Sequence, residues 1–95
     1  MKDAVISLTA LAQTHRLAVF RLLIQREEGG MAAGDIYAYL DIPPSSLSFH
    51  LKELHHARLI KSKQQGRFVI YTANYRQMKS LIGYLSENCC NGTSC

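Results

Sequence analysis

The three cysteines of this 95-residue chain all lie within its last seven positions, as Cys89, Cys90 and Cys95. Thiolates are soft ligands that select thiophilic ions. Zinc in a closed structural site usually takes four ligands, and no histidine lies near these thiols. Three thiolates instead suit a trivalent, trigonal centre such as As(III) or Sb(III), because their charge cancels that of the ion. The thiol tail, residues 89–95, is therefore a candidate metalloid site.

Two other interpretations of the tail remain open at this point. Adjacent Cys89 and Cys90 have Cα atoms only about 3.8 Å apart, below the usual disulfide range, so this pair is better placed to chelate than to cross-link. A disulfide to Cys95 can form in air, which would make the tail a thiol redox sensor. A tail that is only unstructured and reactive is the plain alternative, because chain termini are often poorly ordered.

Length and composition indicate one small domain with an anionic partner. A chain of 95 residues buries only somewhat more than ~60% of its unfolded surface, so a dimer is plausible from size alone. Hydrophobic residues make up 47% and charged residues 19%, which is ordinary for a globular fold. The net charge of +4 and a pI near 9.2 favour an anionic partner such as a nucleic-acid backbone, although a modest excess of this size is also common on proteins that bind nothing anionic.

The first twelve residues superficially resemble a signal peptide, but the element is shorter than the ~15–30 residues such signals need and carries Asp3. Val5, Leu8 and Ala12 instead share one helical face. No stretch approaches the ~18 apolar residues of a membrane span. We therefore expect a cytoplasmic protein without a membrane partner, in a compartment where thiols stay reduced.

Apolar periodicity predicts three further helices between residues 14 and 54. Leu17, Phe20 and Ile24 predict a helix from about residue 14 to 26, which the Gly29–Gly30 pair follows. A shorter helix is expected from residue 31 to 40, with Ile36 and Leu40 pointing inward. Two prolines at 43 and 44 force a turn, and Pro44 suits the first position of the next helix. That helix buries Leu47, Leu51 and Leu54 on one side.

The rest of the chain predicts a hairpin and a last helix. A strand begins at residues 59–60, Gln64, Gln65 and Gly66 form the tip, and residues 67–72 return as a β-branched and aromatic strand. Residues 75 to about 88 carry an apolar stripe of helical period, formed by Met78, Leu81, Ile82 and Leu85. The predicted fold is mainly α with a small β-hairpin, a winged helix-turn-helix in the order α-α-α-α-β-β-α.

Such a fold has two elements that can contact duplex DNA. The helix after Pro44 can enter the major groove, where hydroxyl and amide groups read base edges and cations neutralise phosphates, while the hairpin crosses the backbone or enters a minor groove. The candidate DNA-binding residues are Pro44, Ser45, Ser46, Ser48, Phe49, His50 and Lys52 on the helix and Lys61, Lys63, Gln64, Gln65 and Arg67 on the hairpin. A winged helix that docks a protein and carries a metalloid-scavenging tail is the alternative from another class.

An enzyme is not expected. No Ser/His/Asp or Cys/His nucleophile arrangement is evident, no glycine loop could cradle a phosphate, and no catalytic cofactor is implied. His15 and His50 lie within apolar helical patterns, so we interpret them as packing or hydrogen-bonding histidines rather than metal ligands.

The segment from residue 43 to 75 resembles the recognition helix and wing of the ArsR/SmtB family of winged-helix repressors. Ser48-x-His50-Leu51-x-x-Leu54 matches the family's Ser-x-His-Leu-x-x-Leu pattern, and His15-Arg16-Leu17 looks like its second helix. The chain end SENCCNGTSC looks like the arsenite-sensing subgroup with C-terminal thiols. The resemblance implies a homodimer joined through the first and last helices, repression by binding double-stranded operator DNA, and release on ligand binding.

Two known sites of that family are missing here. The stretch that matches the third-helix Cys-x-Cys pair reads Ala32, Gly34 and Tyr37, and residues 75–88 contain no histidine and no aspartate for an interfacial zinc site. Only the tail then supplies soft ligands. We therefore expect residues 1–88 to form the DNA-binding and dimerisation domain and residues 89–95 a tail in which Cys89, Cys90 and Cys95 bind As(III) or Sb(III) as the inducer.

Overall fold

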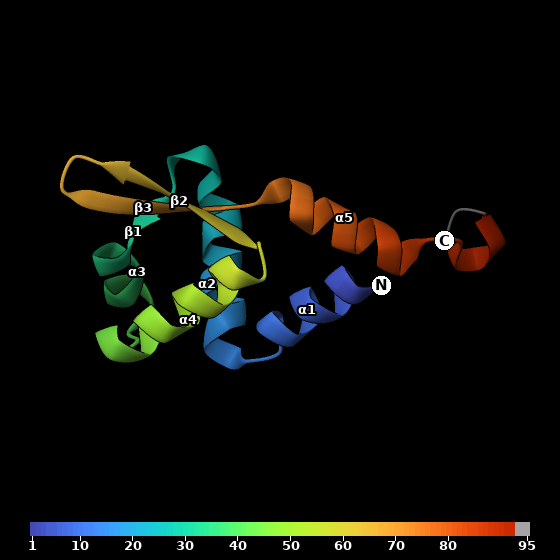
Figure 1. Cartoon of the computed structure of the whole chain (residues 1–95), viewed down its shortest axis with the longest axis horizontal. Helices are drawn as coiled ribbons and strands as arrows, with labels where there is room; N and C mark the ends of the chain where they lie inside the picture. The colour runs from blue at the N-terminus through green and yellow to red at the C-terminus, as the bar shows by residue number, and fades with distance from the viewer. Residues whose placement is uncertain (93–95) are drawn as a thin grey trace.

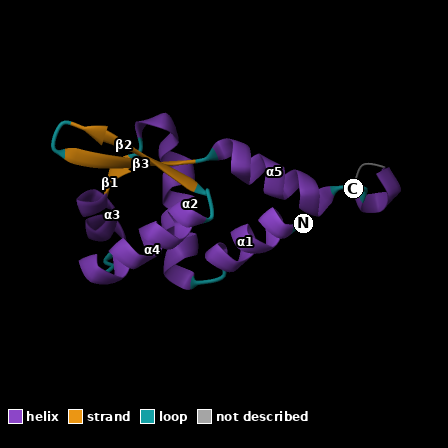
Figure 2. Cartoon of the chain, viewed as in Figure 1, coloured by secondary structure: helices purple, strands orange, loops and turns teal. Residues whose placement is uncertain are grey.

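The computed structural model describes the backbone of residues 1–92 and, within that range, every side chain except those at positions 28, 91 and 92. The elements are α1 (Lys2–Leu11), α2 (Thr14–Arg26), a 3-10 turn (Glu27–Gly29), β1 (Met31–Ala32), α3 (Ala33–Leu40), α4 (Pro44–His56), β2 (Ile60–Gln65), β3 (Phe68–Ala73), α5 (Tyr75–Ser86) and a second 3-10 turn (Cys89–Gly92). Figures 1 and 2 show a helical body with the strands at one end and α5 extending toward the other. The predicted winged helix-turn-helix is confirmed.

Local signals in the sequence set the helix-turn-helix formed by α3 and α4. Asp41 ends α3 in the left-handed conformation at φ 56°, and Ile42 is buried at 3% exposure, which fixes the turn against the core. Pro44 occupies the first turn of α4 as predicted, where its missing N–H costs nothing.

At the start of α2 the Gln13 side chain accepts a hydrogen bond of 2.9 Å from the Arg16 amide.

The core lies between α2, α3, α4 and the strands. Leu47, Leu51 and Leu54 are all buried, as their spacing predicts. The stripe predicted on α2 is only partly correct, because Phe20 is buried whereas Ile24 is half-buried and Leu17 is 44% exposed. Periodicity identifies the apolar face of a helix but not how far a neighbour covers it.

The helix predicted over residues 31–40 was wrong in its first turn. Met31 and Ala32 form β1, which pairs antiparallel with β3 through Met31↔Tyr71 and Ala32↔Ile70, so the sheet has three strands in the order β1-β3-β2. Gly30 makes this possible. Its φ is +64°, and a Cβ at this position would lie 2.4 Å from the Tyr71 carbonyl oxygen.

The hairpin tip lies further along the chain than predicted. Gln64 and Gln65 continue β2 and pair with Val69 and Phe68, which leaves Gly66 and Arg67 as the turn. Gly66 has φ +63°, as a tight two-residue hairpin loop requires. Together, β2, this turn and β3 form the wing.

The last helix is two residues shorter than predicted. Asn74 caps α5 by accepting a hydrogen bond of 3.3 Å from the Gln77 amide, and α5 ends at Ser86. Asn88 then takes a left-handed conformation at φ 59°, which turns the chain into the 3-10 segment that holds Cys89 and Cys90. Figure 1 shows α1 and α5 together at the end of the molecule opposite the wing.

Candidate nucleic-acid interface and thiol tail

The face of α4 that points away from the core is polar and basic. Pro44, Ser45, Ser48 and Lys52 are exposed, and Ser46 is half-buried. Phe49 lies on the same side and is 55% exposed. Because this helix follows the turn of a helix-turn-helix, its outward side chains are those that a major groove would meet. All of these are among the predicted DNA-binding residues.

His50 is the exception among the predicted α4 contacts. It is only 7% exposed, and its Nδ1 lies 3.5 Å from an Nη of Arg16. Its ring meets those of His15 and Phe49 edge-on, with centroids 5.5 and 5.8 Å apart. Burial, then the charge of Arg16 and the neighbouring His15, lower the pKa of His50. The buried ring cannot present itself to a base edge, so we assign His50 to positioning α4 rather than to direct contact.

Arg16 links three helices at this point. Its Nε donates a 2.6 Å hydrogen bond to the Ala10 carbonyl in α1, while its Nη faces His50 in α4. Arg16 itself belongs to the first turn of α2. The interpretation of His50 as a packing or hydrogen-bonding residue agrees with these contacts, whereas His15 is exposed and meets the His50 ring edge-on.

The wing supplies the remaining predicted contacts, all exposed: Lys61, Lys63, Gln64, Gln65 and Arg67. Alternation along β2 divides them between two faces. Lys61, Lys63 and Gln65 line one groove together with Ile70, whereas Ser62 faces α4. The Gln64 amide donates a 2.8 Å hydrogen bond to the Gly66 carbonyl, which braces the turn.

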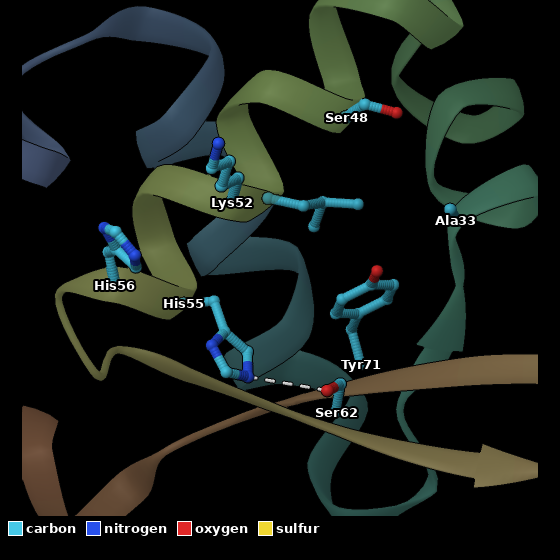
Figure 3. Close-up of a pocket in the computed structure, with 8 residues that line it drawn as sticks. Ala33, Ser48, Lys52, His55, His56, Ser62 and Tyr71 are labelled. Carbon is cyan, nitrogen blue, oxygen red and sulfur yellow. Dashed lines mark hydrogen bonds between the residues drawn. The ribbon is translucent and has the colours of Figure 1, made fainter.

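A pocket of about 260 Å³ separates α4 from the wing (Figure 3). It is lined by Ala33, Ser48, Leu51, Lys52, His55, His56, Ser62 and Tyr71. The His55 Nε2 and the Ser62 Oγ lie 3.4 Å apart across it. Sequence reasoning missed His55, Ser62 and Tyr71, since they come from three elements that only the fold brings together. The alternation of β2 was the one signal that could have separated Ser62 from its lysine neighbours.

Apolar side chains remain uncovered on α1 and α5. Val5 and Leu8 on α1 and Ile82 and Leu85 on α5 are each between 42% and 57% exposed. The two helices are joined by a 3.3 Å hydrogen bond from the Gln77 side-chain amide to the buried hydroxyl of Ser7. Of the apolar stripe predicted on the last helix, Leu81 is buried and Met78 packs against the core, whereas Ile82 and Leu85 lie on the surface of the single chain.

The predicted thiol site is only partly described. Cys89 is exposed, and Cys90 is disulfide-bonded in this structure. Cys95 lies outside the described residues. Within residues 1–92, no three His, Cys, Asp or Glu side chains are grouped closely enough to hold a metal ion. In the same range, no helix is long and apolar enough to cross a bilayer.

Comparisons with known proteins agree with this fold. A model of the family described as "Helix-turn-helix domain" matches residues 11–63, which extend from the end of α1 through α2, α3 and α4 to the first four residues of β2. The solved structure of HlyU from Vibrio cholerae N16961 is 28% identical, with a TM-score of 0.74 over 94% of each chain. An ArsR-like transcriptional regulator from Rhodococcus sp. RHA1 has a TM-score of 0.80 over 90% of this chain and 77% of its own, and at 19% identity it bears on the fold alone.

A sequence relative bears on function more directly. The arsenical resistance operon repressor of Bacillus subtilis (strain 168) is 33% identical over 81 residues, which are 85% of this chain and 73% of that protein. These matches are to DNA-binding regulators, so the prediction that the chain is not an enzyme is confirmed. The chain belongs to the ArsR family of winged-helix transcriptional regulators and is related to arsenical resistance repressors.

Proposed function

We propose that this protein represses transcription by binding operator DNA as a homodimer, and that it is released when the thiolates of Cys89, Cys90 and Cys95 capture As(III) or Sb(III). The observation that carries the DNA-binding part is the exposed polar and basic surface shared by α4 and the wing. Since the proposed ligand is operator DNA, the proposed site of action is the cytoplasm.

Two parts of that surface have different tasks. Ser45, Ser46 and Ser48 on α4 offer hydroxyl groups to base edges in the major groove. Lys61, Lys63 and Arg67 on the wing neutralise phosphates and approach the minor groove. The remaining proposed contacts are Pro44, Phe49 and Lys52 on α4 and Gln64 and Gln65 on the wing.

The exposed apolar faces of α1 and α5 support a homodimer. The side chains of four apolar residues on these two helices are exposed, and apolar side chains that gather on one part of a surface mark interaction sites: Val5, Leu8, Ile82 and Leu85. Pairing these helices with those of a second copy covers them. The wing lies at the opposite end of the molecule, so a dimer of this kind leaves both reading surfaces open (Figure 1). Its two α4 helices would need to lie about 34 Å apart to enter successive major grooves.

The tail is the proposed input because it follows directly on α5. Closing three thiolates around one ion requires the chain after Asn88 to fold back, and this biases α5 and the dimer interface that sets the spacing of the α4 helices. A coupling of ~1–3 kcal/mol would weaken operator binding about 5- to 150-fold. By reciprocity, operator DNA must weaken arsenite binding by the same factor.

The test measures operator binding by fluorescence anisotropy under reducing conditions, with and without arsenite. Wild-type protein is expected to lose affinity when arsenite is added, and the Cys89→Ser/Cys90→Ser/Cys95→Ser variant is expected to bind the operator and ignore arsenite. Release of that variant by arsenite would refute the thiol input. Equal arsenite affinity with and without operator would refute the coupling.

A redox-sensing repressor is the second candidate, and the disulfide at Cys90 favours it. Oxidation of two tail thiols to a disulfide would then replace metalloid capture as the signal. The same anisotropy assay separates the two inputs. Release by a thiol oxidant such as diamide, without any response of the reduced protein to arsenite, would support the redox function and exclude the metalloid one.

A further inference from the structure

We propose that the pocket between α4 and the wing binds one tetrahedral oxyanion, and that in the operator complex this anion is a phosphodiester of the DNA backbone. The second half of this inference rests on the proposed function, because a backbone phosphate reaches the pocket only if α4 and the wing face DNA. The first half can be tested without DNA.

The pocket walls carry hydrogen-bond donors from three elements. α4 contributes Ser48, Lys52 and His55, β2 contributes Ser62, and β3 contributes Tyr71 (Figure 3). Hydroxyl, ammonium and imidazole N–H groups are the donors that phosphate oxygens accept from. The pocket volume of about 260 Å³ is large enough for a phosphate group.

The charge of the lining selects an anion. None of the lining residues is an aspartate or a glutamate, and Lys52 brings a positive charge. Ala33 and Leu51 present only hydrocarbon. A metal ion does not fit the same walls, because the neighbouring His55 and His56 project about 100° apart from a helix and so cannot converge on one ion.

Two of the donors are already held near one another. The His55 Nε2 and the Ser62 Oγ are 3.4 Å apart, a long contact for a hydrogen bond, so little energy is lost when both groups turn to an anion. Figure 3 shows the Tyr71 hydroxyl pointing from the sheet toward the space between α4 and α3. An anion in the pocket would therefore bridge the reading helix to the wing.

The location explains why a phosphate would be useful here. Ser48 and Lys52 line the pocket and also belong to the outward face of α4, while Ser62 lies on the face of β2 that turns toward α4, opposite to the face of Lys61 and Lys63. A phosphate bound between the groove-reading helix and the wing fixes the register of both on the duplex without reading sequence.

The experiment combines protein variants with operators that carry a single uncharged methylphosphonate linkage, moved one position at a time. The variant is His55→Ala/Ser62→Ala, in which both replaced side chains are exposed and their loss leaves the core intact. Tyr71→Phe is a second variant that retains the half-buried ring. Ser80→Ala on α5 is the matched control, since it removes an exposed serine hydroxyl far from the pocket.

We expect one phosphate linkage whose neutralisation weakens operator binding about 10-fold for wild-type protein and for Ser80→Ala. The same neutralisation should weaken operator binding by His55→Ala/Ser62→Ala less than about 2-fold. If every linkage that matters to wild-type protein matters equally to the variants, while all of them bind the intact operator, the pocket holds no backbone phosphate. That result would overturn the DNA half of the inference and leave the proposed function standing.

A second measurement uses inorganic phosphate and no DNA. Titration of ¹⁵N-labelled protein with phosphate against chloride at constant ionic strength should shift the amide signals of Ser62 and Tyr71 in wild-type protein and not in His55→Ala/Ser62→Ala. If these shifts occur but every linkage in the operator scan affects wild-type protein and the variants equally, the pocket binds free phosphate. No shift and no coupling would overturn the inference entirely. If the protein bound no duplex at all, the proposed function would fail and this titration alone would decide the pocket.

Discussion

Replacing Arg67 by glutamine at the tip of the wing should reduce the salt dependence of operator binding. Four exposed basic side chains, Lys52, Lys61, Lys63 and Arg67, lie on α4 and the wing, so a dimer carries eight. If each neutralises one phosphate, the slope of log K against log salt is about −7, at about −0.9 for each contact. Arg67→Gln removes two contacts from the dimer and should bring the slope to about −5.4.

The loss of affinity follows from the same slope. Two missing contacts change the slope by about 1.8, which corresponds to a loss of up to about 60-fold at 0.1 M salt and almost none as the salt concentration approaches 1 M. The assay is fluorescence anisotropy of a labelled operator over a series of KCl concentrations. Arg21→Gln on α2 is the control, because it removes an exposed basic side chain from a helix outside both the proposed DNA-binding surface and the proposed dimer interface, and should leave the slope unchanged.

The outcome separates two kinds of contact. Phosphate contacts carry no sequence information, so Arg67→Gln should weaken binding to operator and to unrelated duplex by similar factors. Ser48→Ala, in contrast, should reduce discrimination between the two with little change of slope. An unchanged slope in Arg67→Gln, with the operator still bound, would show that the wing tip does not touch the backbone and would refute the proposed role of this residue.

Three further predictions concern stability and assembly. Gly30→Ala should lower the free energy of unfolding by about 2 kcal/mol or more, because the φ of Gly30 is +64° and the new Cβ would meet the Tyr71 carbonyl. The control is Gly83→Ala, which has no atom within 4 Å of the new Cβ and should not lower this free energy. Urea titration measures both variants, and equal effects would contradict the role of Gly30. The pKa of His50 in the folded protein lies below its ordinary value of 6.5, so the unfolded chain binds the proton more readily; the stability that neutral His50 contributes should be fully present above about pH 6.5 and fall as the pH drops below it. Urea titrations of wild-type protein and His50→Gln at pH 7.5 and 5.5 isolate this contribution. A difference between the two proteins that does not change with pH would refute it. Leu85→Asp should convert the proposed dimer to a monomer in sedimentation velocity and weaken operator binding without unfolding the chain, since Leu85 is 57% exposed. A wild-type dimer that Leu85→Asp leaves unchanged would exclude this part of α5 from the interface.

Local patterns were sufficient for most of the helical architecture. The bounds of α2 came from its apolar spacing and the glycines that follow it, and the start of α4 came from Pro44. The hairpin was found from its β-branched run and Gly66, although its tip was placed too early. These signals depend on neighbours within a few residues, and such short-range information is contained in a linear sequence.

The sequence by itself determined which residue types follow one another: three thiols at the end, leucines on one side of α4 and serines on the other, and lysines along β2. Only the tertiary structure decided which of these residues meet. It buried His50 beside Arg16, paired Met31 with Tyr71, left Leu85 uncovered and joined His55 to Ser62 across a pocket. The physical reason is that periodicity specifies the apolar face of an element, whereas burial and pocket formation depend on which distant segment packs against that face.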